Sequence, residues 1–184
     1  MPNFPLNMLR AVAVALLVSQ LLFSQSSPRT YTSKGRTIRY AVATFNPPVE
    51  ITPSNGGLNQ DTSINCVRLY WSRLQDLDIQ AAAQLYVDPQ REIDLRTKYR
   101  QRVGEAVFRE IHEKLFESTR FTHELIIGTE HALVSDKNPG FLMLFRVRDG
   151  KFFLESADVN KFTPDALDLI TLVNDYGDGK LKFD

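Results

Sequence analysis

Four side chains in this sequence are candidates for acid–base catalysis. The first is His123, because a histidine that titrates near neutral pH suits the task of a general base. In a regular strand it shares the parity of Phe121 and Leu125, which directs it into the space between a sheet and its helices. Its candidate partners are Tyr86, Tyr99 and Asp158. The alternative, which we favour, is a hydrogen-bonded structural histidine at the sheet edge, since strand ends often lie at the solvent boundary.

Histidines and carboxylates also flank one predicted hairpin, and such groups can bind zinc. The residues are His123, Glu124, Glu130 and His131. Neighbours in a strand point to opposite faces, so at best one histidine and one glutamate converge, which is too few ligands. The sequence also lacks a glycine-rich phosphate loop and a Gly-x-Ser-x-Gly motif. We therefore predict no metal, no cofactor and no confident catalytic residue.

Charge and cysteine content narrow the function further. The 184 residues contain 22 Lys and Arg against 22 Asp and Glu, so no basic excess is available to neutralise phosphates. This argues against nucleic acid as a partner. Cys66 falls within a helical apolar pattern and is predicted to be a buried core residue. His112, on a highly charged helix, is predicted to lie at the surface.

The first 26 residues predict a secretory signal peptide. Arg10 precedes an apolar run over residues 11–23, and Ser24 and Ser26 suit the small-residue positions before a cleavage site. The alternative is an uncleaved membrane anchor, but a spanning helix needs about 20 apolar residues and this run is shorter. We expect an exported protein, periplasmic or secreted, with membrane anchoring as the alternative.

Loop signals dominate residues 27–60, which we interpret as a flexible tether with one short strand at 37–44. Residues 61–184 form the predicted domain. Its expected helices cover 64–74, 79–86, 91–118 with a break near Gly104, and 164–173; its expected strands cover 122–127, 132–135, 140–147 and 151–159. The apolar stripe of the long helix is Tyr99, Val103, Phe108, Ile111 and Leu115. Helices followed by an antiparallel meander predict an α+β fold with helices packed on one face of the sheet.

Two segments carry a family resemblance. Residues 70–86, YWSRLQDLDIQAAAQLY, resemble the opening of NTF2-like (cystatin-like) domains, where a helix, an acidic break and a second helix precede the sheet. The hairpin FLMLFRVRDGKFFLE at 141–155 resembles the last long hairpin of that superfamily. The resemblance covers about residues 61–159 and implies a curved antiparallel sheet that forms a cone with the helices. The last predicted helix lies beyond the usual end of that fold.

The strand at 141–147 is apolar on both faces, so both faces should be covered. One cover is the set of amphipathic helices. The other is the final helix, the N-terminal strand or a second subunit. Because many NTF2-like domains pair through the outer sheet face, the resemblance implies a homodimer.

Two functions are compatible with this sequence. We favour a non-enzymatic binding or assembly module for a protein partner or a small apolar ligand, similar in design to VirB8-type periplasmic domains if the N-terminal segment is retained. The alternative resembles SnoaL-like and ketosteroid-isomerase-like enzymes of small apolar substrates, with His123 or Asp158 as the base and Tyr86 or Tyr99 as the hydrogen-bond donor. A pocket with convergent titratable groups would favour the enzyme, and an interior filled by aromatic side chains would favour the module.

Overall fold

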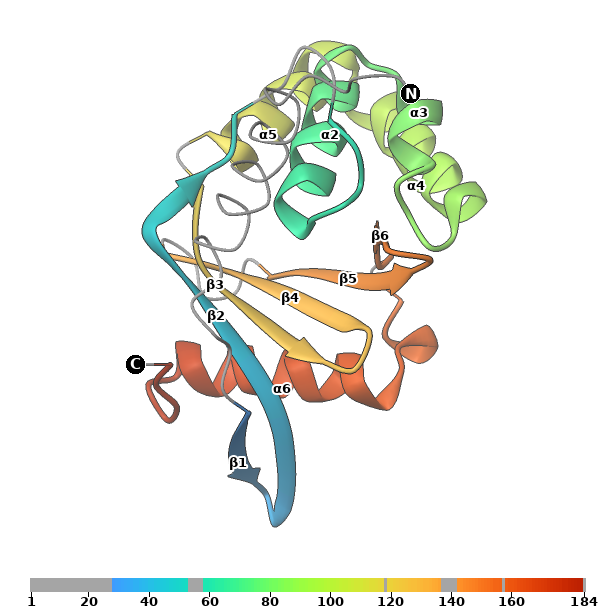
Figure 1. Ribbon diagram of the computed structural model, residues 1–184. Helices are drawn as coiled ribbons and strands as arrows, with labels where there is room; N and C mark the ends of the chain where they lie inside the picture. Colours follow the sequence, from blue (N-terminus) through green and yellow to red (C-terminus); the bar gives the residue numbers. More distant parts are fainter. Residues whose placement is uncertain (1–27, 53–57, 118, 137–141, 157, 184) are drawn as a thin grey trace, which may run out of the picture.

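The computed structural model describes residues 28–52, 58–117, 119–136, 142–156 and 158–183 (Figure 1). The predicted signal peptide lies outside these residues. The described chain is an α+β domain with a six-stranded antiparallel sheet in the order β1-β2-β3-β4-β5-β6. The strands are β1 (Arg29–Ser33), β2 (Arg36–Glu50), β3 (Arg120–Ile127), β4 (Glu130–Ser135), β5 (Leu142–Arg148) and β6 (Lys151–Leu154).

The helices begin where the sequence supplies caps. They are α2 (Ser63–Gln75), α3 (Ile79–Ala83), α4 (Pro89–Val103), α5 (Glu105–Phe116) and α6 (Pro164–Gly177), with the short 3-10 turn η1 (Val159–Lys161). Thr62, Asp78 and Thr163 accept hydrogen bonds from backbone amides in the first turns of α2, α3 and α6. Gly104, with a φ of 83°, separates α4 from α5 and confirms the predicted break. The Asp149-Gly150 turn, with both φ angles positive, joins β5 to β6 as predicted.

The sheet separates two apolar cores. In Figure 1, helices α2 to α5 lie on one face of the sheet and α6 runs along the other. Large side chains of the first core are Trp71, Phe108, Phe116, Phe121 and Phe145. Large side chains of the second core are Tyr40, Leu125, Leu144, Leu172 and Phe183. Both faces of β5 are therefore covered, as its sequence required, and α6 is the second cover.

The described residues of the expected tether, 28–52 and 58–60, differ from that expectation. Arg29–Ser33 and Arg36–Glu50 form β1 and β2, and β2 is an interior strand that pairs with both β1 and β3. Pro47 and Pro48 fall at the register shift between Thr44 and Val49, where β2 leaves its ladder with β3. A bulge tolerates proline, so these loop signals are compatible with a long strand.

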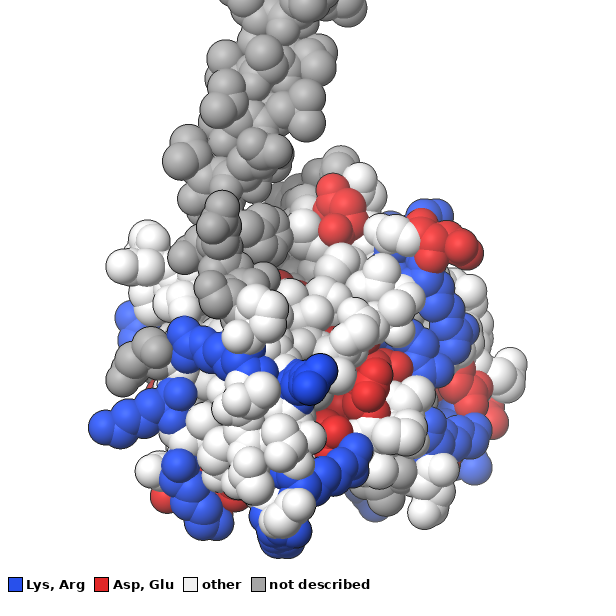
Figure 2. Space-filling model, turned by 60° about the horizontal axis from the view of Figure 1, so that its bottom comes forward, with Lys and Arg blue, Asp and Glu red and all other residues white. Residues whose placement is uncertain are grey.

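Several element ends also differ. Helix α3 ends at Ala83, and Tyr86 instead forms a parallel bridge with Leu154. Strand β6 ends at Leu154 and α6 continues to Gly177. The first two residues of the predicted strand at 140–147 lie outside the described residues. The outer side of α6, turned forward in Figure 2, carries acidic and basic side chains between uncharged ones.

Cys66 is fully buried in the first core, as predicted. Its thiol donates a 3.3 Å hydrogen bond to the carbonyl of Phe152, and burial raises its pKa to about 12. We expect no reaction with an aromatic disulfide reagent at pH 8 in the folded protein and stoichiometric reaction in denaturant, since the thiolate is the nucleophile. Rapid labelling of the folded chain, followed by absorbance, would contradict this expectation.

Candidate functional site

A cavity of about 660 Å³ lies between α4 and α5. Its lining residues are Tyr86, Glu92, Leu95, Arg96, Lys98, Tyr99, Arg102, Ile111, His112, Leu115 and Glu155. Tyr86 follows α3 and Glu155 follows β6, so four parts of the chain meet there. This volume falls within the range of about 300–1,000 Å³ that is typical of small-molecule sites.

The walls of the cavity follow from helix geometry. On α4, Leu95, Lys98, Tyr99 and Arg102 have the spacing i, i+3, i+4 and i+7, which places them on one face. On α5, Ile111 and Leu115 lie one turn apart on the opposing wall.

Exposed apolar side chains gather at the cavity. Leu95, Ile111 and Leu115 are 46%, 39% and 41% exposed, and with Val107 and Leu167 they complete the exposed large hydrophobic side chains of the described residues. Three of those five residues therefore line one cavity. Clustered exposed apolar side chains are typical of a binding surface, whereas scattered ones need no explanation.

A buried polar chain forms one side of the cavity. Glu92, 3% exposed, accepts a hydrogen bond from Nε of Arg96, and Nη1 of Arg96 lies 3.0 Å from Nε2 of His112. Nδ1 of His112 lies 2.7 Å from the carbonyl oxygen of Phe108. A carbonyl only accepts, so Nδ1 carries the proton and Nε2 accepts from Arg96. Both ring nitrogens are thus occupied, and His112 is not a free base.

His112 is neutral in this environment. Burial, together with the nearby Arg96 charge, lowers its pKa below the ordinary value of 6.5. Because the unfolded chain then binds more protons, this group stabilises the fold fully above about pH 6.5 and less as the pH falls through its folded pKa.

We expect the wild-type protein to lose more unfolding free energy than a His112→Gln variant between pH 8 and pH 5. Urea denaturation at both pH values measures the difference, and a proton NMR titration of the His112 ring gives its pKa directly. The same pH dependence in both proteins would contradict the assignment.

Tyr86 and Glu155 are the titratable groups at the remaining side of the cavity. Burial raises the pKa of Tyr86 well above 10, so its hydroxyl stays protonated. Burial also raises the pKa of Glu155, although Arg146, whose Nη2 lies 2.7 Å from Glu155 Oε1, opposes the shift. A protonated phenol and a carboxyl group of raised pKa that line one cavity can donate and exchange protons with a ligand.

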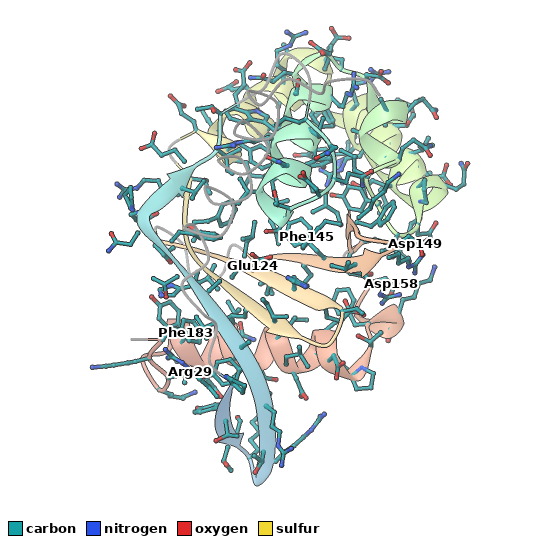
Figure 3. The ribbon with its side chains drawn as sticks, in the orientation of Figure 1. Arg29, Glu124, Phe145, Asp149, Asp158 and Phe183 are labelled. Carbon is teal, nitrogen blue, oxygen red and sulfur yellow. The ribbon has the colours of Figure 1, made fainter. Side chains whose placement is uncertain are left out.

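The cavity contains two of the four predicted site residues, Tyr86 and Tyr99. Asp158 is not among its lining residues. It pairs with Arg91, which lowers the pKa of its carboxyl group. Figure 3 shows Asp158 toward the right-hand side of the view.

His123 points to the side of the sheet opposite to the predicted one. A register shift between Phe121 and His123 breaks the assumed parity: Phe121 belongs to the core beneath α2 to α5, and Leu125 to the core beneath α6. The His123 ring lies 5.3 Å from that of Phe183, which Figure 3 places on the side of α6.

One histidine and one glutamate of the predicted hairpin do converge. Nδ1 of His131 lies 2.9 Å from Oε1 of Glu124, on the sheet face that also carries Phe145 (Figure 3). Glu130 points the other way and pairs with Arg146. No group of three or more metal-ligating side chains occurs within the described residues.

Sequence reasoning missed the buried polar chain because it placed His112 at the surface, which is wrong. His112 is 4% exposed and shares the buried face of α5 with Phe108 and Phe116. The predicted stripe instead placed Ile111 and Leu115 on the inner face. The signal that could have found His112 is the spacing i, i+4, i+8 of Phe108, His112 and Phe116.

Comparison of the chain with protein-family models, curated proteins and solved structures gave no match. Among the described residues, no helix combines the length and apolar character needed to span a bilayer.

Proposed function

We propose that this chain is an exported, NTF2-like binding module whose site is the α4–α5 cavity. The observation that carries the proposal is the convergence on one cavity of Leu95, Ile111 and Leu115, each at least 39% exposed. Helices that precede an antiparallel meander and cover one of its faces support the NTF2-like part. The β1–β2 hairpin and α6 are additions to that pattern.

The packing of the first core supports binding over catalysis. The space between the sheet and the helices is filled by aromatic rings, with Trp71 stacked on Phe116 at 5.4 Å and Tyr70 against Tyr86 at 5.4 Å. A filled interior leaves the outer cavity for a ligand or a partner.

The binding site can be tested with Nile red, a neutral dye that fluoresces in apolar surroundings. We expect saturable binding by the protein and about tenfold weaker binding by Leu115→Asn, because a polar amide in the wall opposes burial of an apolar ligand. Leu167→Asn is the matched control, since Leu167 is 43% exposed on α6 and does not line the cavity. Equal binding by both variants would reject the cavity as the site.

The enzymatic alternative retains one supporting observation, the meeting of Tyr86 and Glu155 at the cavity. In that version Glu155, in place of His123 or Asp158, exchanges a proton with a small apolar ketone, and Tyr86 donates a hydrogen bond to its oxygen. Deuterium incorporation next to the carbonyl of a bound cyclic ketone, detected by mass spectrometry and lost in Glu155→Gln, would support it.

Export and self-association belong to the same proposal. Intact mass of the protein recovered from its producing cell tests export: loss of about the first 26 residues is expected, and a full-length mass would indicate an anchored protein.

Helix α6 covers the outer face of the sheet, so little of that face remains exposed for a homodimer contact. Within the described residues, the outer edge of β6 is occupied by backbone hydrogen bonds from Phe152 to Gln60 and from Leu154 to Leu85. Edge pairing would therefore use β1. Light scattering that shows only monomer at tens of micromolar protein would remove the dimer from the proposal.

A further inference from the structure

We infer that the α4–α5 cavity selects an amphiphilic anion, an apolar chain that ends in an acidic group, because apolar walls and two unpaired cations meet there. This inference rests on the proposed binding function and specifies the class of ligand.

The apolar part of the ligand is set by the walls. Leu95 faces Ile111 and Leu115 across the gap between the helices, and the ring of Tyr99 extends the same surface along α4. A chain laid between these side chains would remove their exposed area from water together with its own, which is the main favourable term for such a ligand.

The expected charge of the ligand follows from which charged lining residues already form ion pairs. Glu92 is neutralised by Arg96, and Glu155 faces Arg146. Lys98 and Arg102 also line the cavity, and no described acidic side chain forms an ion pair with either. The lining therefore presents two free positive charges and no free negative charge.

The two free cations lie together. Lys98 and Arg102 are four residues apart on α4, so they project one above the other at the same rim. The guanidinium carbon of Arg102 lies 5.3 Å from the centre of the Tyr99 ring. This cation–π contact holds the positive charge of Arg102 beside the apolar wall. The charge of Arg96 is already paired, because its Nε donates to Glu92, and its Nη1 lies 3.0 Å from His112 Nε2.

The experiment uses displacement of Nile red from the folded protein by decanoate and by decan-1-ol, each below its micelle or solubility limit. The two compounds share a chain and differ in the charge of the head group. We expect decanoate to compete about tenfold better than decanol, and this ratio to fall as salt is added. In Lys98→Gln/Arg102→Gln the ratio should approach one, with decanol affinity unchanged.

The matched control is Arg100→Gln/Arg109→Gln, which removes the same charge from α4 and α5 at residues that do not line the cavity. It should keep most of the preference for decanoate. Equal competition by the two compounds in the wild type, or a preference that survives in Lys98→Gln/Arg102→Gln, would overturn the anionic ligand while leaving the binding module intact. Failure of Leu115→Asn to weaken Nile red binding would instead overturn the proposed function itself.

Discussion

Replacing Leu172 by alanine is expected to lower the free energy of unfolding by about 3 kcal/mol, and the same change at Leu167 by less than about 0.5 kcal/mol. Both leucines belong to α6. Leu172 is fully buried against the sheet, whereas Leu167 is 43% exposed. Removing the Leu172 side chain loses its full transfer free energy and leaves a cavity. Removing the Leu167 side chain loses only part of its transfer free energy and leaves no enclosed cavity.

Urea denaturation followed by far-ultraviolet circular dichroism measures both changes. The comparison also tests whether α6 is part of the cooperative unit, because both variants have the same helix propensity. If α6 docked only weakly, Leu172→Ala would detach the helix and leave the main transition in place. Similar small losses in both variants would therefore contradict the second core.

The fold could be predicted where local chemistry determines it. Thr62, Asp78 and Thr163 are capping residues that act on amides within three positions, and Asp149-Gly150 suits a turn with positive φ angles. These signals fixed the starts of three helices and the last hairpin. They do not depend on distant parts of the chain, so the amino-acid sequence alone reveals them.

Residues 29–50 could not be predicted in the same way. Their proline and glycine content indicated a loop, yet β2 is held by partners at residues 120–126, which are far away in sequence. Strand formation there depends on non-local pairing, which outweighs local preference. The prolines were accommodated because they lie at a register shift.

The site was partly predictable for a related reason. Tyr86 and Tyr99 were expected as partners of His123. They do line one cavity, but neither His123 nor Asp158 lines it. His123 was assigned to the wrong face because a bulge, which changes parity, has no clear signature in sequence. The apolar stripe was carried across Gly104, although α5 starts a new helical phase there.

The largest electrostatic effect is expected at Arg146, which lies between two buried carboxylates. Its Nε lies 2.8 Å from Glu130 Oε1 and its Nη2 lies 2.7 Å from Glu155 Oε1. The carboxylate side chains are 4% and 5% exposed, so solvent screens them little. Arg146→Met keeps most of the side-chain volume and leaves both carboxylates without their cation, at a cost of about 3–5 kcal/mol at pH 7.

The pH dependence separates loss of charge from loss of packing. Burial already raises the pKa of Glu155. Arg146 opposes this shift more than the exposed Arg148 does, so removing Arg146 raises the pKa further. At pH values above the ordinary glutamate pKa of 4.5, the folded variant then binds more protons than its unfolded chain. The stability of the variant therefore falls as the pH rises from 4.5 through the raised pKa of Glu155. The deficit relative to wild type should therefore be smaller at pH 5 than at pH 7.

Arg148→Met is the matched control, since Arg148 lies two residues along β5 and is exposed. We expect it to change stability by less than about 0.5 kcal/mol at either pH. If Arg146→Met lost the same free energy at pH 5 and pH 7, the arginine would act through packing of its aliphatic stem and not through charge. A smaller deficit at pH 5 would instead identify Arg146 as the cation that keeps Glu155, a lining residue of the cavity, ionised within the fold.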